Sequence, residues 1–254
     1  MTYKGYENKV EYIKKEFGNY YVDAGPEHGI LQGYKYAGSS THCTNCLATL
    51  VKMVDAKNVL EIGSWHYDTS NAMAKAMDQL YGEDGYGVID SFDIREGGYD
   101  GHTEYKPNSK RVNALYWYPY HSNMASFKYK NQEIDSSGKE IKIPYSDFVD
   151  YDNNEICEKN ISILKDSAKE FGGVYDFIFI DGDHSYEGIK RDFEVIKKVS
   201  DKNTLIVIDN VWDIRLKDVR QFYDELELIK WDFEEWNDDH VSDNMVQDTA
   251  ICIL

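Results

Sequence analysis

The chain has no long hydrophobic run, few cysteines and no N-terminal signal region, and each absence excludes a class of protein. No apolar stretch approaches the roughly 20 residues that a membrane-spanning helix needs. The segment from Met1 to Glu7 contains no apolar signal region. Four cysteines in 254 residues are too few and too scattered for a disulfide scaffold. We therefore expect a cytoplasmic protein whose core needs no covalent cross-links.

Basic residues are also scarce, which limits the expected partners. The chain has 46 acidic residues against 28 lysines and arginines, and its formal net charge is −18. Phosphate contacts need a basic surface, so we do not expect nucleic acid as a partner. The same charge argues against binding to an anionic membrane surface. A small molecule is the expected partner.

The length fits one large α/β domain with additions, and we find no repeat or linker that would divide the chain. Residues 1–40 have weak periodicity, and we predict that they form an N-terminal cap or substrate segment. The main domain is predicted over residues 41–254, with an insertion at about 122–154. Within this insertion, alternating patterns at 128–133 and 139–143 flank a polar turn, which predicts a β-hairpin.

Short apolar runs alternate with helical patterns along the main domain. Continuous apolar runs are typical of strands buried on both faces of a parallel sheet. Strands are predicted at 58–63, 87–94, 112–120, 175–180, 205–208, 230–236 and 249–254. Helices are predicted at 11–17, 41–54, 70–80, 156–171, 186–199 and 213–228. This alternation predicts an α/β fold with a doubly wound, mostly parallel, seven-stranded sheet and helices on both faces.

Two of these apolar runs end abruptly in polar side chains. The run at 175–180 is followed by Asp181, Asp183 and His184, and the run at 205–208 by Asp209 and Asn210. Parallel strands end at the same sheet edge, where the ligand crevice of such sheets lies. Oxygen ligands meeting there would suit a divalent cation such as Mg²⁺. The competing interpretation is that these residues cap a helix or form turns.

A possible nucleoside site follows the first predicted strand. This strand contains Glu61 and ends at Gly63, and the next strand carries Asp90 and Asp93. A glycine lets a ligand approach the backbone, and a distal carboxylate can accept hydrogen bonds from ribose hydroxyls. The further glycines of a pyrophosphate-binding motif are missing. A ligand with a cationic centre and no phosphate therefore fits this loop better.

These motifs together resemble those of class I S-adenosylmethionine-dependent methyltransferases. Residues 59–63 are similar to the first motif of that family. Residues 180–188 resemble the macrocin type of metal-dependent O-methyltransferase, and residues 208–212 resemble the catechol and caffeoyl-CoA type. The resemblance covers residues 58–210 and implies a Rossmann-like methyltransferase fold. It also implies methyl transfer from S-adenosylmethionine to a hydroxyl of a small sugar-like or catechol-like acceptor, assisted by Mg²⁺ or another divalent cation.

The resemblance also implies roles for individual residues. Asp181, Asp209 and Asn210 would hold the metal, and either Asp183 or His184 would act as general base. The cofactor-binding residues that it implies are Glu61, Gly63, Ser64, Asp181, and Asp93 or Asp90 at the ribose. Relatives of this kind often pair, so a homodimer is an expected assembly.

Two other functions remain open. A dinucleotide-dependent oxidoreductase would use a similar sheet, although the missing glycines count against it. A non-catalytic binding protein with a degenerate methyltransferase fold would be consistent with Tyr67 and Asp68, which stand where the family has a second glycine. Cys43 and Cys46 have the spacing of half a zinc site, but no second pair follows. We expect these two cysteines to be buried on a helix face.

Overall fold

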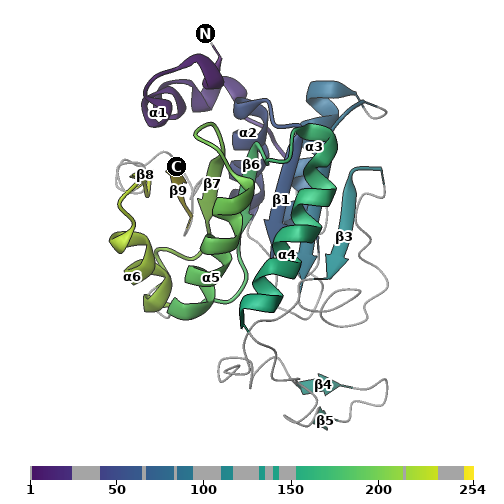
Figure 1. Cartoon of the computed structure of the whole chain (residues 1–254). Coiled ribbons are helices and arrows are strands. Elements are labelled where there is room, and N and C mark those ends of the chain that lie inside the picture. The colour runs from purple at the N-terminus through teal and green to yellow at the C-terminus, as the bar shows by residue number, and fades with distance from the viewer. Residues whose placement is uncertain are drawn as a thin grey trace.

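A seven-stranded sheet forms the centre of the computed structural model (Figure 1). The structure describes residues 2–24, 41–64, 67–82, 85–93, 110–116, 132–134, 140–142, 153–213, 216–233 and 249–254. The strand order is β3-β2-β1-β6-β7-β9-β8. The strands of this sheet are β1 (Asn58–Ile62), β2 (Val88–Asp93), β3 (Val112–Tyr116), β6 (Phe177–Ile180), β7 (Leu205–Ile208), β8 (Ile229–Trp231) and β9 (Ala250–Ile253).

Most neighbouring strands of the sheet are parallel. Strand β1 pairs in parallel with β2 and β6, and β2–β3 and β6–β7 are also parallel. Only β9, which runs antiparallel to both β7 and β8, breaks the pattern in the described part of the sheet. The predicted doubly wound, mostly parallel, seven-stranded sheet is therefore confirmed.

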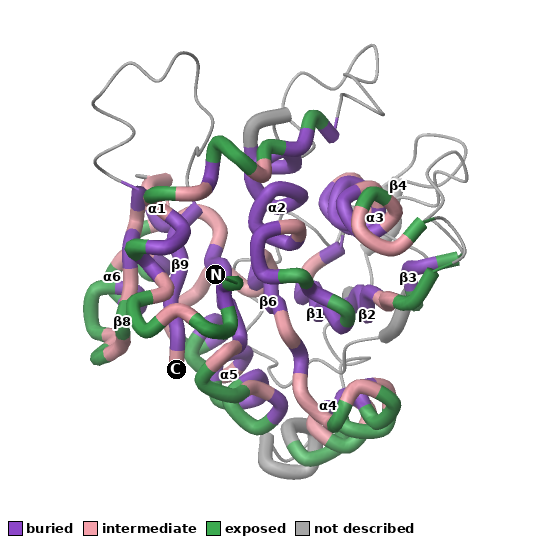
Figure 2. Tube along the Cα trace, turned by 90° about the horizontal axis from the view of Figure 1, so that it is seen from above, coloured by how far each residue is buried: buried purple, intermediate pink, exposed green. Residues whose placement is uncertain are grey.

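Helices cover both faces of the sheet, and Figure 2 shows α2 and α3 on one side of the strands and α4 and α5 on the other. The helices are α1 (Lys9–Tyr20), α2 (Thr41–Val54), α3 (Asp68–Tyr81), α4 (Asn153–Ser167), α5 (Tyr186–Ile196) and α6 (Lys217–Glu225), with short 3₁₀ helices η1 (Tyr3–Gly5), η4 (Ala168–Phe171) and η5 (Lys197–Val199). Within the described residues, no helix has the length and hydrophobicity needed to cross a membrane.

Side chains alternate between two hydrophobic cores along each strand, because successive residues of a strand point to opposite faces. In β6, Phe177 and Phe179 lie in the core under α1–α3, whereas Ile178 and Ile180 lie in the core under α4–α6. Strand β7 alternates in the same way. This alternation decides which face each polar residue at the strand ends occupies.

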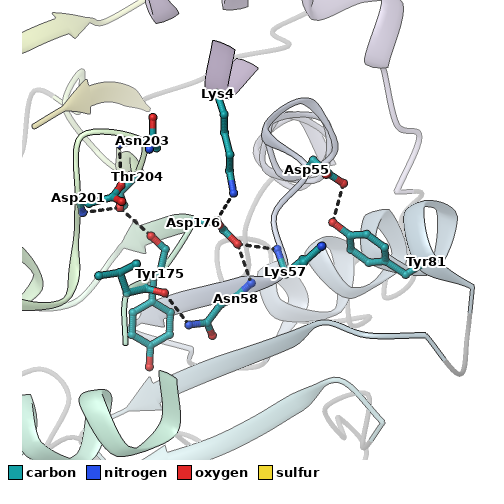
Figure 3. Close-up of polar contacts among 11 residues, drawn as sticks. Lys4, Asp55, Lys57, Asn58, Tyr81, Tyr175, Asp176, Asp201, Asn203 and Thr204 are labelled. Carbon is teal, nitrogen blue, oxygen red and sulfur yellow. Dashed lines mark hydrogen bonds and ion pairs between the residues drawn. The ribbon is translucent and has the colours of Figure 1, made fainter. Parts of the chain in front are cut away.

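The N-terminal segment packs at the amino edge of the parallel strands, shown at the top of Figure 1. Asn8 caps α1 by accepting a hydrogen bond from the backbone N–H of Glu11, and Ile13 and Phe17 join the first core. Lys4 Nζ lies 2.6 Å from Asp176 Oδ1 just before β6 (Figure 3). Residues 2–17 therefore lie away from the carboxyl edge. The cap over residues 1–40 stays a prediction, and 25–40 lie outside the described residues.

The predicted hairpin is present as a separate two-stranded sheet. Strand β4 (Gln132–Ile134) pairs antiparallel with β5 (Glu140–Lys142). The rest of the predicted insertion lies outside the described residues, apart from the start of α4 at Asn153. Helix α4 begins three residues before the predicted start at residue 156.

Candidate active site

The chain reverses its direction across the sheet between β1 and β6. From β1 it moves outward to β2 and β3, then returns to β6 and β7 on the other side. Such a switch point is where open α/β sheets bind ligands, outside the carboxyl ends of the strands. The register pairs Ile62 with Ile180 and Ile180 with Ile208. The residues after β1, β6 and β7 therefore meet at one edge.

Gly63 brings the loop after β1 into contact with the end of β6. Its φ of +91° is a backbone conformation that side-chain-bearing residues rarely adopt, and a Cβ at this position would lie 2.0 Å from the carbonyl oxygen of Asp181. Its N–H donates to Phe92 O at 2.7 Å. The close approach that requires this glycine is thus to the protein's own backbone.

Glu61 is buried beneath the site. Its carboxylate accepts hydrogen bonds from the hydroxyls of Thr69 and Ser70 at the start of α3, and from Ser91 Oγ at 2.5 Å. Burial raises the pKa of Glu61 to about 7, the three hydroxyls oppose this shift, and the charge of Asp181 adds to it. Glu61 thus ties α3 and β2 to β1, and its oxygens face hydroxyls of the protein.

Sequence reasoning missed these three hydroxyl partners. A signal was present, because Thr69 and Ser70 follow one another at the start of a helix, and Ser91 is a polar residue inside an apolar strand. All three side chains are buried. Small hydroxyl residues at buried positions indicate that a polar group nearby needs partners.

Ser64 offers a polar atom in the first loop. The residue is 3% exposed, and its Oγ has no hydrogen-bond partner among the described residues. The backbone N–H of Tyr67 donates to Ser64 O at 2.6 Å, and Tyr67 adopts a left-handed φ of 62° before α3 begins. Buried polar atoms are nearly always paired in proteins. The hydroxyl of Ser64 is therefore suited to a ligand in this loop.

Asp90 and Asp93 occupy different places on β2. Asp90 is fully buried and accepts hydrogen bonds from Tyr175 Oη at 2.7 Å and from Asn113 Nδ2 at 2.9 Å. Tyr175 belongs to the core under α4–α6, on the face opposite to Glu61. Asp93 is the last residue of β2 and lies at the carboxyl edge, and its side chain lies outside the described atoms. The position of Asp93 suits a ribose ligand better.

The residues after β6 form two pairs. His184 and Asp181 are the candidates for catalysis, and Asp183 and Ser185 lie at the start of α5. His184 Nε2 lies 3.0 Å from Asp181 Oδ1, and both side chains are about a quarter exposed, at 28% and 26%. Asp183 Oδ1 accepts from the backbone N–H of Ser185 at 2.9 Å, and Ser185 Oγ accepts from Gly188 N–H at 3.1 Å. Ser185 is the cap of α5, and Asp183 is engaged with it. Of Asp183 and His184, the two candidates for the base, His184 is the one that pairs with the carboxylate of Asp181.

Asp181 and Asp209 are neighbours across the sheet. The N–H of Asp209 donates to Ile180 O at 3.0 Å, and strand alternation places both carboxylates on the α1–α3 face. Neighbouring strands are separated by about 5 Å. Asn210 follows in a left-handed conformation with φ 61°. Two carboxylates and an amide oxygen fit a hard divalent cation in number and kind.

No group of three or more His, Cys, Asp or Glu placed to hold a metal ion occurs among the described residues. His184 therefore does not complete a site with the two aspartates, and Asn210 as the third metal ligand stays a prediction. Cys43 and Cys46 are buried on α2, and burial raises the pKa of the Cys46 thiol to about 12. Their burial agrees with the expectation of a helix face in the core.

Comparisons with known proteins give a family. A family model described as a methyltransferase domain matches residues 60–211, which is more than half of the chain. A search of curated proteins gave no match. Two similar solved structures are the O-methyltransferase from Bacillus cereus in complex with SAH and the O-methyltransferase TomG from Streptomyces achromogenes, involved in tomaymycin synthesis, in complex with SAM.

The first is 18% identical with a TM-score of 0.46, over 87% of this chain and 84% of that chain. The second is 14% identical with a TM-score of 0.48, over 85% and 81%. These similarities are too weak to support an argument about function. The matched family model, with the strand order found here, shows that the chain belongs to the methyltransferase domain family and has the Rossmann-like fold of class I S-adenosylmethionine-dependent methyltransferases.

Proposed function

We propose that the protein transfers a methyl group from S-adenosylmethionine to a hydroxyl of a small sugar-like or catechol-like acceptor, with the help of a divalent cation such as Mg²⁺. The observation that carries this proposal is the meeting of three strand ends at the switch point, where the Gly63 loop touches Asp181. Membership of the methyltransferase domain family supports the same reaction class.

The cofactor is assigned to the edge formed by β1 and β2. When bound, S-adenosylmethionine supplies a methyl group on a sulfonium centre. Ser64 contributes a buried hydroxyl that can pair with the methionine end, and Asp93 lies at the strand end suited to the ribose hydroxyls. Glu61 supports the cofactor site indirectly. Its hydrogen bonds with Thr69 and Ser70 fix the start of α3 against β1.

His184 is the general base in this proposal. A hydrogen bond from Nε2 to Asp181 would leave Nδ1 as the unprotonated nitrogen, which can accept the acceptor's hydroxyl proton. Asp181 then fixes the tautomer and orientation of the ring, as carboxylates do for catalytic histidines in other enzymes. Asp183 is the weaker choice, since its carboxylate is engaged at the start of α5. A positioned base of this kind contributes about 10²–10⁴-fold to the rate.

Asp181, Asp209 and Asn210 would hold the cation. Asp181 has a second carboxylate oxygen besides the one that contacts His184, so it can serve both partners. When bound, the cation lowers the pKa of the acceptor hydroxyl and fixes its direction. Since the proposed ligand groups follow β6 and β7, we expect the acceptor to bind between this edge and the cofactor loop.

Calorimetry with S-adenosylmethionine tests the cofactor, and a nicotinamide-fluorescence titration of the same protein tests the oxidoreductase alternative. We expect S-adenosylmethionine to bind, and we expect the fluorescence of the reduced dinucleotide to stay unchanged when the protein is added. The absence of S-adenosylmethionine binding would refute the proposal and favour a degenerate fold.

Methyl transfer to a panel of sugars and catechols then tests the chemistry. His184→Ala should lower kcat by about 10²–10⁴-fold while the Kd for the cofactor stays within about twofold. Asp183→Asn is the matched control, because an amide oxygen can still accept from Ser185. Turnover in chelator equal to turnover in Mg²⁺ would refute the metal role.

A further inference from the structure

The loop after β7, residues 209–213, is held by two contacts of the Trp212 side chain. Trp212 is only partly buried, yet its Nε1–H donates to the carbonyl oxygen of Asp232 at 2.9 Å. The guanidinium carbon of Arg220 lies 4.4 Å from the centroid of the Trp212 ring. We call Trp212, Arg220 and Asp232 the Trp212 clamp. It joins this loop to α6 and to the residue after β8.

Arg220 is itself fixed, so the stacked pair is a defined geometry. Its Nε donates to Asp224 Oδ2 at 2.9 Å and its Nη1 to Asp232 Oδ2 at 3.3 Å. A second ring, that of Tyr223, lies 5.9 Å from the guanidinium carbon. A cation held over an indole face is attracted electrostatically by the ring. Trp212 therefore packs against a guanidinium that two carboxylates hold in place.

The residues next to Trp212 include the predicted metal ligands Asp209 and Asn210. Asn210 has a left-handed φ of 61°, and the N–H of Asp213 donates to its carbonyl oxygen at 3.2 Å, closing a tight turn. Asparagine is among the non-glycine residues that adopt this conformation most readily, so the contacts of the residues after it fix where the turn lies. Val211 is 1% exposed and anchors the turn in the core under α4–α6. Trp212 is the second anchor, on the outer side.

We propose that Trp212 is a positioning residue for Asp209 and Asn210, and that the Trp212 clamp orients the two oxygen ligands that this turn contributes to the cation site. The proposal rests on the metal role in the proposed function. Residues that orient metal ligands from outside typically change metal affinity by 10–100-fold when they are replaced. Gly63 in the cofactor loop lies against the backbone of Asp181 after β6, so we expect cofactor binding not to depend on the clamp.

Binding of Mn²⁺, followed by the electron paramagnetic resonance signal of the free ion, tests this role without measuring turnover. Trp212→Phe keeps a ring for Arg220 but removes the N–H donor, and Trp212→Leu removes both. Lys230→Met is the matched control, because Lys230 Nζ ties β8 to α6 through the carbonyls of Tyr223 and Asp224 without touching the turn. Calorimetry with S-adenosylmethionine and thermal unfolding are measured on every variant.

We expect the Kd for Mn²⁺ to rise about tenfold in Trp212→Phe and further in Trp212→Leu. The Kd for S-adenosylmethionine should stay within about twofold, and Lys230→Met should lower the Tm without changing Mn²⁺ binding. Equal Mn²⁺ affinity in wild type and both Trp212 variants would overturn this inference alone. If the Trp212 variants also bound S-adenosylmethionine more weakly, or if Lys230→Met lost as much Mn²⁺ affinity as they do, the clamp would be only a structural contact and the inference would fail. A wild-type protein that binds no Mn²⁺ would overturn the metal role and this inference together.

Discussion

Replacing Glu61 with glutamine should remove a large pH dependence of stability. Glu61 is fully buried, and its pKa rises from 4.5 to about 7 because burial disfavours the charged carboxylate. Between these two values the folded protein holds a proton that the unfolded chain releases. Unfolding therefore becomes easier as pH rises through this window. Since one pKa unit corresponds to about 1.4 kcal/mol, the full effect is about 3 kcal/mol.

Urea unfolding of the wild type and Glu61→Gln between pH 5 and pH 8 measures this term. The difference in unfolding free energy, wild type minus variant, should fall by about 2 to 3 kcal/mol from pH 5 to pH 8. Glutamine keeps the size of the side chain, and the hydroxyls of Thr69, Ser70 and Ser91 can donate to its oxygen and accept from its N–H groups. Subtracting the unfolding free energy of the variant from that of the wild type also removes the contribution of the other titrating groups, which the two proteins share.

Glu194→Gln is the control, because this side chain is 56% exposed on α5. The difference in unfolding free energy between wild type and Glu194→Gln should not fall in this way from pH 5 to pH 8, because this variant keeps the buried carboxylate of Glu61. A flat difference between wild type and Glu61→Gln would refute the reasoning, because it would mean that burial does not perturb Glu61. A variant that is less stable than wild type at pH 8 would show that the three hydroxyls need a carboxylate.

Replacements at three further positions test contacts that hold the edges of the sheet. Gly63→Ala should cost about 3 kcal/mol or more in urea unfolding, because overpacking against Asp181 adds to the strain of its positive φ. Arg111→Met should lower stability by about 3 kcal/mol in the same assay. The buried guanidinium donates hydrogen bonds to Asp78 and to the backbone carbonyls of Gly82, Tyr86 and Gly87. Asp176→Ala should cost about 1 to 3 kcal/mol, whereas Asp176→Asn should cost about 1 kcal/mol or less, because an amide oxygen can still accept from two backbone N–H groups. Equal losses in the two Asp176 variants, or stability unchanged in the other two, would contradict these assignments.

The sheet could be predicted from the sequence because two of its central strands, β6 and β7, contain no polar residue. Phe177–Ile180 and Leu205–Ile208 are buried at every position, and only strands covered on both faces have this pattern. The polar residues after these strands were predicted to share an edge, and the register of β6 and β7 confirms that they do. Helix ends were predicted less closely, and α6 (Lys217–Glu225), for example, is shorter at both ends than the predicted range 213–228.

The sequence does not reveal contacts between distant segments. Lys4 and Asp176 are 172 positions apart, so the packing of the N-terminal segment at the amino edge could not be derived from local patterns. Asp90 and Tyr175 are 85 positions apart, and their hydrogen bond is what distinguishes Asp90 from Asp93. Nor does periodicity reveal which acid after β6 pairs with His184, because that choice depends on loop geometry.

The contact between Gly63 and Asp181 has a consequence for how the protein can change. A methyl group cannot be inserted between the two backbones, and the N–H of Asp181 donates to Ile62 O at 2.8 Å. The segments assigned to cofactor binding and to proton removal are therefore joined through the backbone. We expect new acceptor preferences to arise by exchange of the surrounding segments, because a larger residue at position 63 would separate these two.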